Sequence, residues 1–170
     1  MTVDEFLAWA EQQPGRGYEL LDGEVVGMAP ERVAHVRTKV QVFDRMRDAI
    51  REAGVPCEAL LDGVGFRTDE HNVFIPDVIV RCGDALPGDV SVMDDPVIVL
   101  EVLSPSTQQV DTTIKLDRYF RVGSVYHYLI VPAGGQPIVH HRRVADGIMT
   151  HIVQPGPLRL DPPGITLMLD

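Results

Sequence analysis

Hydrophobic residues fall into two kinds of pattern along this chain, continuous runs and helical repeats. Two short runs rich in Val and Ile, 75–80 and 97–103, are bounded by Pro, Gly and Asp, which is typical of strands buried on both faces. Each run carries one carboxylate, Asp77 near the start of the first and Glu101 inside the second. Because a charge in a buried strand is costly unless it is paired or bound to a metal, we expect a divalent cation between these acids.

Helical spacing appears first between residues 31 and 53, and Gly54 is placed to end this predicted helix. His35 lies near its start, where a lone histidine is usually structural or solvated. Its predicted buried face consists of Val33, Val36, Val40, Phe43, Met46 and Ile50. Its predicted solvated face is the densest basic cluster in the chain and the first place to look for a phosphate contact: Arg37, Lys39, Arg45, Arg47 and Arg51.

A second helix is predicted over about 110–121, between the strand 97–103 and another buried strand, 125–131. This order is typical of a parallel βαβ crossover. Lys115 lies four residues from both Asp111 and Tyr119, so the three side chains share one helix face. An ordinary ion pair between Lys115 and Asp111 is the alternative to a site role for this lysine.

Shorter signals complete the predicted fold. Thr2 and Glu5 have the spacing of a capping box, which predicts a short helix ending near Gln12. Asp22-Gly23 predicts a hairpin turn, with Glu19 on its first strand either as an edge-strand acid or near the site. Further strands are expected at 57–61, 65–67 and 165–169, a loop at 83–96, and a second hairpin around 145–147. The alternation of helices and strands predicts an α/β fold with a mixed β-sheet flanked by helices.

Length and charge narrow the class of protein. At 170 residues the chain is expected to be a single domain, 1–170, and no apolar run approaches the roughly 20 residues of a membrane span, so we expect a cytoplasmic protein without membrane contact. Cys57 and Cys82 lack CxxC spacing, which indicates neither a zinc site nor a disulfide. The net charge of −10 argues against a general polyanion binder. It is still compatible with an enzyme that contacts phosphate through a bound metal ion.

Read together, these segments resemble the Uma family of restriction-endonuclease-like proteins, within the wider PD-(D/E)XK nuclease superfamily. The resemblance covers about residues 7–143. The matching segments are 18–25, His35, Pro76-Asp77-Val78, 101–107, Asp111, Lys115, Tyr119 and the strand after Gly123. The superfamily's Glu-x-Lys pattern would place a lysine at 103, where this chain has Leu103, so Lys115 is expected to take that place. The chain also departs from the family at His127-Tyr128 and Val131-Pro132.

The resemblance implies a restriction-endonuclease-like fold and a metal-dependent endonuclease that hydrolyses phosphodiester bonds in DNA, with a homodimer as its expected assembly. Mg²⁺ or Mn²⁺ would be held by Asp77, Glu101 and the backbone carbonyl of Val102. Asp77, Glu101 and Lys115 would be the catalytic residues, with Lys115 positioning water or stabilising charge. Auxiliary roles are expected for Glu19, His35 and Tyr119.

Two alternatives stay open at this level. Asp77 can instead be a structural residue, an acid at the start of a strand whose carboxylate accepts a hydrogen bond from a nearby backbone N–H. The whole chain has the alternative of a catalytically silent binding or assembly module on the same fold, and hydrolysis of another phosphoester is a third interpretation. Ser104 is excluded as an acyl-transfer nucleophile because Gly-x-Ser-x-Gly is missing around it.

Overall fold

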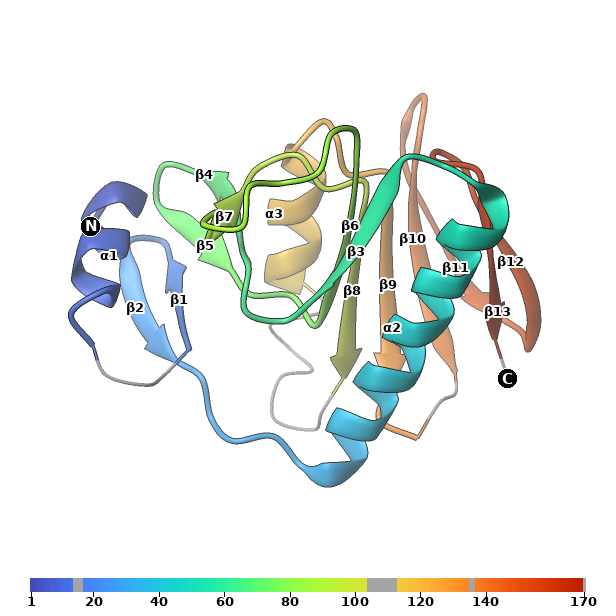
Figure 1. Cartoon of the computed structure of the whole chain (residues 1–170), viewed down its shortest axis with the longest axis horizontal. Helices are drawn as coiled ribbons and strands as arrows, with labels where there is room; N and C mark the ends of the chain where they lie inside the picture. Colours follow the sequence, from blue (N-terminus) through green and yellow to red (C-terminus); the bar gives the residue numbers. More distant parts are fainter. Residues whose placement is uncertain (14–16, 104–112, 135–136, 170) are drawn as a thin grey trace.

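The computed structural model describes residues 1–13, 17–103, 113–134 and 137–169, and it is built on a central mixed sheet (Figure 1). The strands of this sheet lie in the order β11-β10-β9-β8-β6-β3. Their bounds are β3 Cys57–Leu61, β6 Val78–Cys82, β8 Ile98–Leu103, β9 His127–Pro132, β10 Ile138–Val144 and β11 Gly147–Val153. Strands β8 and β9 pair in parallel and the other neighbours are antiparallel, which confirms the predicted crossover and the α/β class with a mixed sheet.

The remaining elements cover this sheet. A smaller sheet has the order β2-β1-β5-β4-β7, with bounds β1 Tyr18–Leu21, β2 Glu24–Gly27, β4 Gly65–Asp69, β5 Asn72–Phe74 and β7 Val92–Met93. A hairpin joins β12 Gly156–Leu160 and β13 Ile165–Leu169. The helices are α1 Val3–Ala10, α2 Val33–Ala53 and α3 Lys115–Arg121. None of these described helices has the length and apolarity needed to cross a bilayer.

Side chains of β8 alternate between two hydrophobic cores. Leu100 and Val102 belong to the core that packs against α2 and the β12–β13 hairpin. Val99 belongs to the core on the opposite face, which packs against α3 and the smaller sheet. Figure 1 shows α2 crossing one face of the central sheet, with α3 between that sheet and β4, β5 and β7. Glu101 is two residues after Val99 on the same strand, so its side chain is on the same face of the sheet and is directed toward α3.

Helix α2 departs from its predicted face in its first half. Gly54 ends the helix in the left-handed conformation with φ 63°, as predicted. Val33, Val36 and Val40, however, are exposed. The buried stripe is His35, Lys39, Val42, Met46, Ala49 and Ile50. The prediction that Lys39 lies on the solvated face is therefore wrong, because the polar first turns of α2 face a polar site and only its later turns face the core.

Several boundaries also differ from the predicted ones. Strand β6 begins at Val78, so Asp77 lies in a bend just before it rather than within a strand. The predicted loop 83–96 contains the short β7, and β12 was not predicted. Ser104 and Asp111, with the predicted start of the α3 helix at 110, lie outside the described residues.

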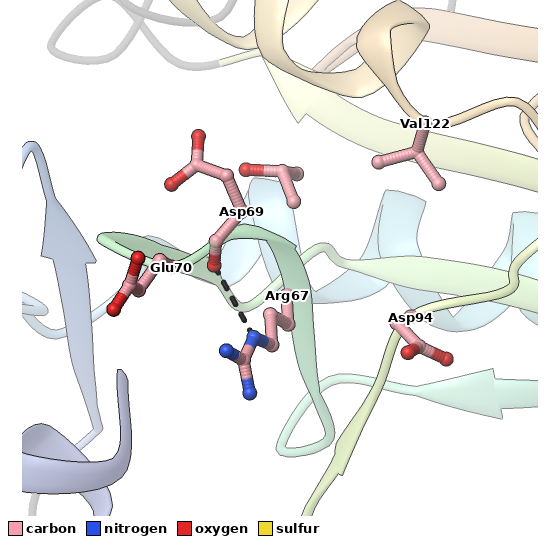
Figure 2. Close-up of a pocket in the computed structure, with 6 residues that line it drawn as sticks. Arg67, Asp69, Glu70, Asp94 and Val122 are labelled. Carbon is pink, nitrogen blue, oxygen red and sulfur yellow. Dashed lines mark hydrogen bonds between the residues drawn. The ribbon is translucent and has the colours of Figure 1, made fainter. Parts of the chain in front are cut away.

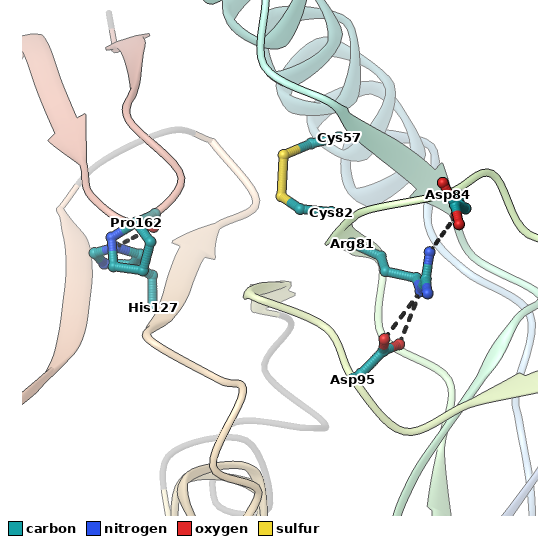
Figure 3. The surroundings of a disulfide bond; sticks show 7 residues. All are labelled: Cys57, Arg81, Cys82, Asp84, Asp95, His127 and Pro162. Carbon is teal, nitrogen blue, oxygen red and sulfur yellow. Dashed lines mark hydrogen bonds and ion pairs between the residues drawn. A yellow bond between two sulfur atoms is a disulfide. The ribbon is translucent and has the colours of Figure 1, made fainter.

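The two cysteines form a disulfide, which overturns the expectation that they are unpaired (Figure 3). Cys57 on β3 and Cys82 on β6 are directly opposite in the antiparallel register. Next to Cys82, the Arg81 Nε donates to both carboxylate oxygens of Asp95 at 2.9 and 3.2 Å. The two cysteines are 25 residues apart, so their spacing gave no signal of the pairing. Only the strand register brings them together.

Candidate functional site

A cavity of about 400 Å³ opens where the β1–β2 hairpin, the start of α2, the end of β8 and the start of α3 meet. In Figure 1 the end of β8 and the first turn of α2 lie toward the same lower edge of the molecule. The cavity wall includes six of the seven residues predicted for the site: Glu19, His35, Asp77, Glu101, Val102 and Lys115. Tyr119 is fully buried and lies behind Glu101.

Asp77 is buried and both of its carboxylate oxygens accept hydrogen bonds. The Val102 N–H donates to Oδ2 at 2.6 Å, and His35 Nε2 lies 3.0 Å from Oδ1. The hydrogen bond to Asp77 raises the pKa of His35 above its ordinary value, aided by the charges of Asp77 and Glu31, although burial opposes the shift. The strand-start interpretation of Asp77 is therefore accurate for its Val102 contact, but incomplete.

Glu101 is held from α3. Its Oε1 accepts from the Lys115 ammonium at 2.8 Å and from the Tyr119 hydroxyl at 2.7 Å. Burial and the nearby Glu101 charge raise the pKa of Tyr119 well above its ordinary value, so the phenol stays a neutral donor. The four-residue spacing of Lys115 and Tyr119 thus brings both side chains to one carboxylate.

Lys115 also links Glu101 to the smaller sheet. Its Nζ lies 3.6 Å from Glu19 Oε1 and 5.8 Å from the centre of the Phe74 ring. Glu19 is fixed in turn, because its Oε1 accepts from the Ile75 N–H at 2.9 Å. Glu19 therefore lies at the site rather than on a free sheet edge.

Three residues that the sequence interpretation missed lie beside Asp77. Lys39 Nζ is 2.6 Å from both oxygens of Glu31 and 2.6 Å from Asp62 Oδ2. His35 and Lys39 are four residues apart on one face of α2, and Glu31 comes four residues earlier, just before the helix; this spacing was the available signal. Asp62 gave no such signal; its N–H bonds the Asp77 carbonyl at 3.1 Å and so brings the β3–β4 turn to the site.

A candidate metal group lies within this set. Among the described residues, one ligand atom each from Glu31, His35 and Asp77 lie within 4.8 Å of one another. Oxygen ligands suit Mg²⁺ and Mn²⁺, while an imidazole nitrogen suits transition metals better than Mg²⁺. The donor set therefore fits a divalent cation.

A second hollow of about 350 Å³ shares no lining residue with the first (Figure 2). Its labelled residues are Arg67, Asp69, Glu70, Asp94 and Val122. Arg67 Nε donates to the Asp69 carbonyl at 3.3 Å, and its Nη1 lies 3.6 Å from Asp4 Oδ1. This hollow contains none of the residues predicted for the site.

Comparison with known proteins gives the family and the fold of this chain. A family model described as "Uma2: Putative restriction endonuclease" matches residues 3–169. The chain belongs to this family. An uncharacterised protein of Synechocystis sp. (strain ATCC 27184 / PCC 6803 / Kazusa) is 26% identical over 148 residues, 86% of this chain and 76% of that protein. A crystal structure from Anabaena variabilis ATCC 29413, described as "a putative nuclease belonging to DUF820", superposes with a TM-score of 0.73 at 15% identity, over 95% of this chain and 90% of that one. This last similarity shows that the Uma2 chain has a DUF820 nuclease-like fold.

Proposed function

We propose that this Uma2 protein is a metal-dependent endodeoxyribonuclease that hydrolyses phosphodiester bonds. The observation that supports it most is the cavity in which Asp77 and Glu101 lie with Lys115. Asp77 lies directly before β6 and Glu101 lies in the neighbouring strand β8, and the Val102 N–H, one residue after Glu101, donates to Asp77. DNA is the substrate proposed from family membership.

Asp77, Glu101 and the Val102 carbonyl are the groups proposed to hold Mn²⁺ or Mg²⁺, with Glu31 and His35 next to Asp77. A bound ion would supply Lewis-acid polarisation of the phosphate and a water of lowered pKa. His35 and the Val102 amide keep the Asp77 carboxylate in one orientation. This preorganisation lowers the cost of ordering the ligand when a cation arrives.

Lys115 has the position to stabilise negative charge that develops on a phosphate. Its ammonium lines the cavity between Glu101 and Glu19. Tyr119 donates to the same Glu101 oxygen from the buried side, so both α3 residues hold the carboxylate from one direction. Fixed charges and dipoles of this kind act without reorganisation during the reaction.

The test is cleavage of supercoiled and linear duplex DNA in Mn²⁺ and Mg²⁺ by the purified chain. Asp77→Asn and Glu101→Gln are each expected to lower the rate by more than the roughly 10- to 100-fold typical of changes around a metal site. Glu52→Gln, on the exposed side of α2, is the matched control and should cleave at the wild-type rate. Cleavage that persists in both site variants would contradict the proposal.

A second candidate function is a catalytically silent binding or assembly module. It is favoured by the cations already bound to the acids, Lys115 to Glu101 at 2.8 Å and Lys39 to Glu31 at 2.6 Å, and by the net charge of −10. Titration of Mn²⁺ into the purified chain separates the two functions. No binding tighter than millimolar, together with no cleavage of any nucleic acid, would favour the module.

A further inference from the structure

The chain has two lysines, Lys39 and Lys115, and both are buried against carboxylates of this site. Lys115 lines the cavity, where a substrate could reach it. Lys39 is not part of that lining, and its side chain is only 5% exposed. The two lysines therefore have different roles, and Lys39 does not act on a substrate directly.

Lys39 lies inside a cage of three carboxylates, Glu31, Asp62 and Asp77. Its Nζ is 2.6 Å from Glu31 Oε1 and Oε2, 2.6 Å from Asp62 Oδ2 and 3.6 Å from Asp77 Oδ1. An ammonium has three N–H donors, and the three short contacts match that number. One ammonium thus brings together four oxygens of three acids that would otherwise repel one another.

Lys39 remains a cation over the neutral pH range. Burial acts to lower its pKa, but the hydrogen bonds to Asp62 and Glu31, with the charges of Asp77 and Asp62, outweigh it and raise the pKa above the ordinary value. The cage therefore holds the positive charge of Lys39, and His35 Nε2 lies beside it, 3.0 Å from Asp77 and 3.8 Å from Glu31.

An environment of carboxylate oxygens around a cation is also what hard divalent ions prefer, and phosphodiester-cleaving sites often pair two such ions about 4 Å apart. Asp77 belongs both to the cage and to the proposed metal ligands, and Glu31 of the cage also belongs to the candidate metal group with His35 and Asp77. We propose that Lys39 is a positioning residue that takes the place of a second divalent cation, so that the wild-type cage binds no divalent ion of its own. This inference rests on the proposed function only through the shared Asp77 and Glu31.

The test is the number of Mn²⁺ ions bound per chain, measured by isothermal titration and by electron paramagnetic resonance of free Mn²⁺. Lys39→Met removes the ammonium and its charge and otherwise retains an unbranched side chain, one heavy atom shorter. We expect it to bind one Mn²⁺ more than wild type. We also expect its melting temperature to lie below that of wild type in EDTA and to rise with Mn²⁺ by more than wild type does, because the added ion replaces the lost charge.

Two further variants distinguish binding of an ion in the cage from a non-specific loss of stability caused by Lys39→Met. Lys39→Arg retains a cation and should bind no additional ion. The double variant Lys39→Met with Asp62→Asn removes a cage ligand and should lose the additional ion. If Lys39→Met does not fold in EDTA, it is refolded with Mn²⁺; folding that depends on the ion supports the proposal, and failure in both conditions overturns it.

The outcomes also distinguish this inference from the proposed nuclease function. Equal ion counts in wild type and Lys39→Met, or two ions in wild type, would overturn the role of Lys39. An additional ion in Lys39→Met with none in wild type would support the cage and refute the metal site of the proposed nuclease.

Discussion

Two buried histidines predict that the protein loses stability in mild acid. His127 on β9 and His140 on β10 are 0% and 1% exposed, and His127 Nδ1 lies 2.9 Å from His140 Nε2. The other His127 nitrogen lies 3.0 Å from the Pro162 carbonyl, so it is the protonated one (Figure 3). Burial lowers the pKa of His127 from 6.5 to about 4 and that of His140 to about 3.

The free energy of unfolding falls as the pH is lowered because the unfolded chain binds more protons than the folded protein. Below pH 6.5 these histidines become protonated in the unfolded chain but stay neutral in the folded protein. The stability that they contribute above pH 6.5 is therefore lost as the pH falls toward 4. Between pH 7 and 5 each group contributes a loss of about 2 kcal/mol, and the pair at most about 4 kcal/mol. His141, whose pKa burial also lowers, acts in the same direction. His35 acts oppositely, because its pKa is raised and its contribution is present at pH 5 and lost as pH rises.

Urea unfolding at pH 7 and pH 5 measures this loss in wild type and in His140→Gln, which no longer titrates at that position. The variant is expected to lose about 2 kcal/mol less than wild type between the two pH values, whatever its stability at pH 7. His71→Gln, which removes an exposed histidine, is the matched control and should show the wild-type loss. Equal losses in wild type and His140→Gln, with unchanged dependence on urea, would refute the assignment of His140 as a buried neutral group.

Three other stability changes follow from the contacts. Tyr119→Phe removes the 2.7 Å hydrogen bond to Glu101 and should cost about 1.5–3 kcal/mol in urea unfolding; no change would show that the bond contributes nothing. Gly54→Ala should cost about 1 kcal/mol in the same assay, since φ is 63° and no atom lies within 4 Å of an added Cβ; a cost near zero would contradict the left-handed cap. Reduction of Cys57–Cys82, which closes 25 residues, should lower stability by about 3 kcal/mol, and identical melting with and without reductant would contradict the pairing.

Sequence patterns predicted the fold well where local chemistry decides it. The Thr2–Glu5 capping box and the Asp22-Gly23 turn, with φ of 49° and 81°, are present because a few neighbouring residues suffice to form each. The disulfide was missed because it depends on the register of β3 against β6. Strand register is set by tertiary packing, which spacing along the chain does not encode.

The candidate site was predicted in part for a related reason. Asp77 and Glu101 were recognisable because each interrupts an apolar run, and a buried charge needs a partner. Lys39 was assigned to solvent because hydrophobic periodicity counts only apolar positions, whereas the buried stripe of α2 continues through His35 and Lys39. Valines such as Val33 were predicted to be buried but are exposed, so the predicted buried face is wrong in the first half of α2.

The two acids are held by helices that pack on opposite faces of the central sheet. Glu101 is directed to α3, where Lys115 and Tyr119 hold it, while the next amide, of Val102, donates to Asp77. Asp77 is bound in turn by His35 of α2. A ligand that draws Asp77 and Glu101 together therefore acts on α2 and α3 at once, and replacing either acid removes a contact that ties one of these helices to the central sheet.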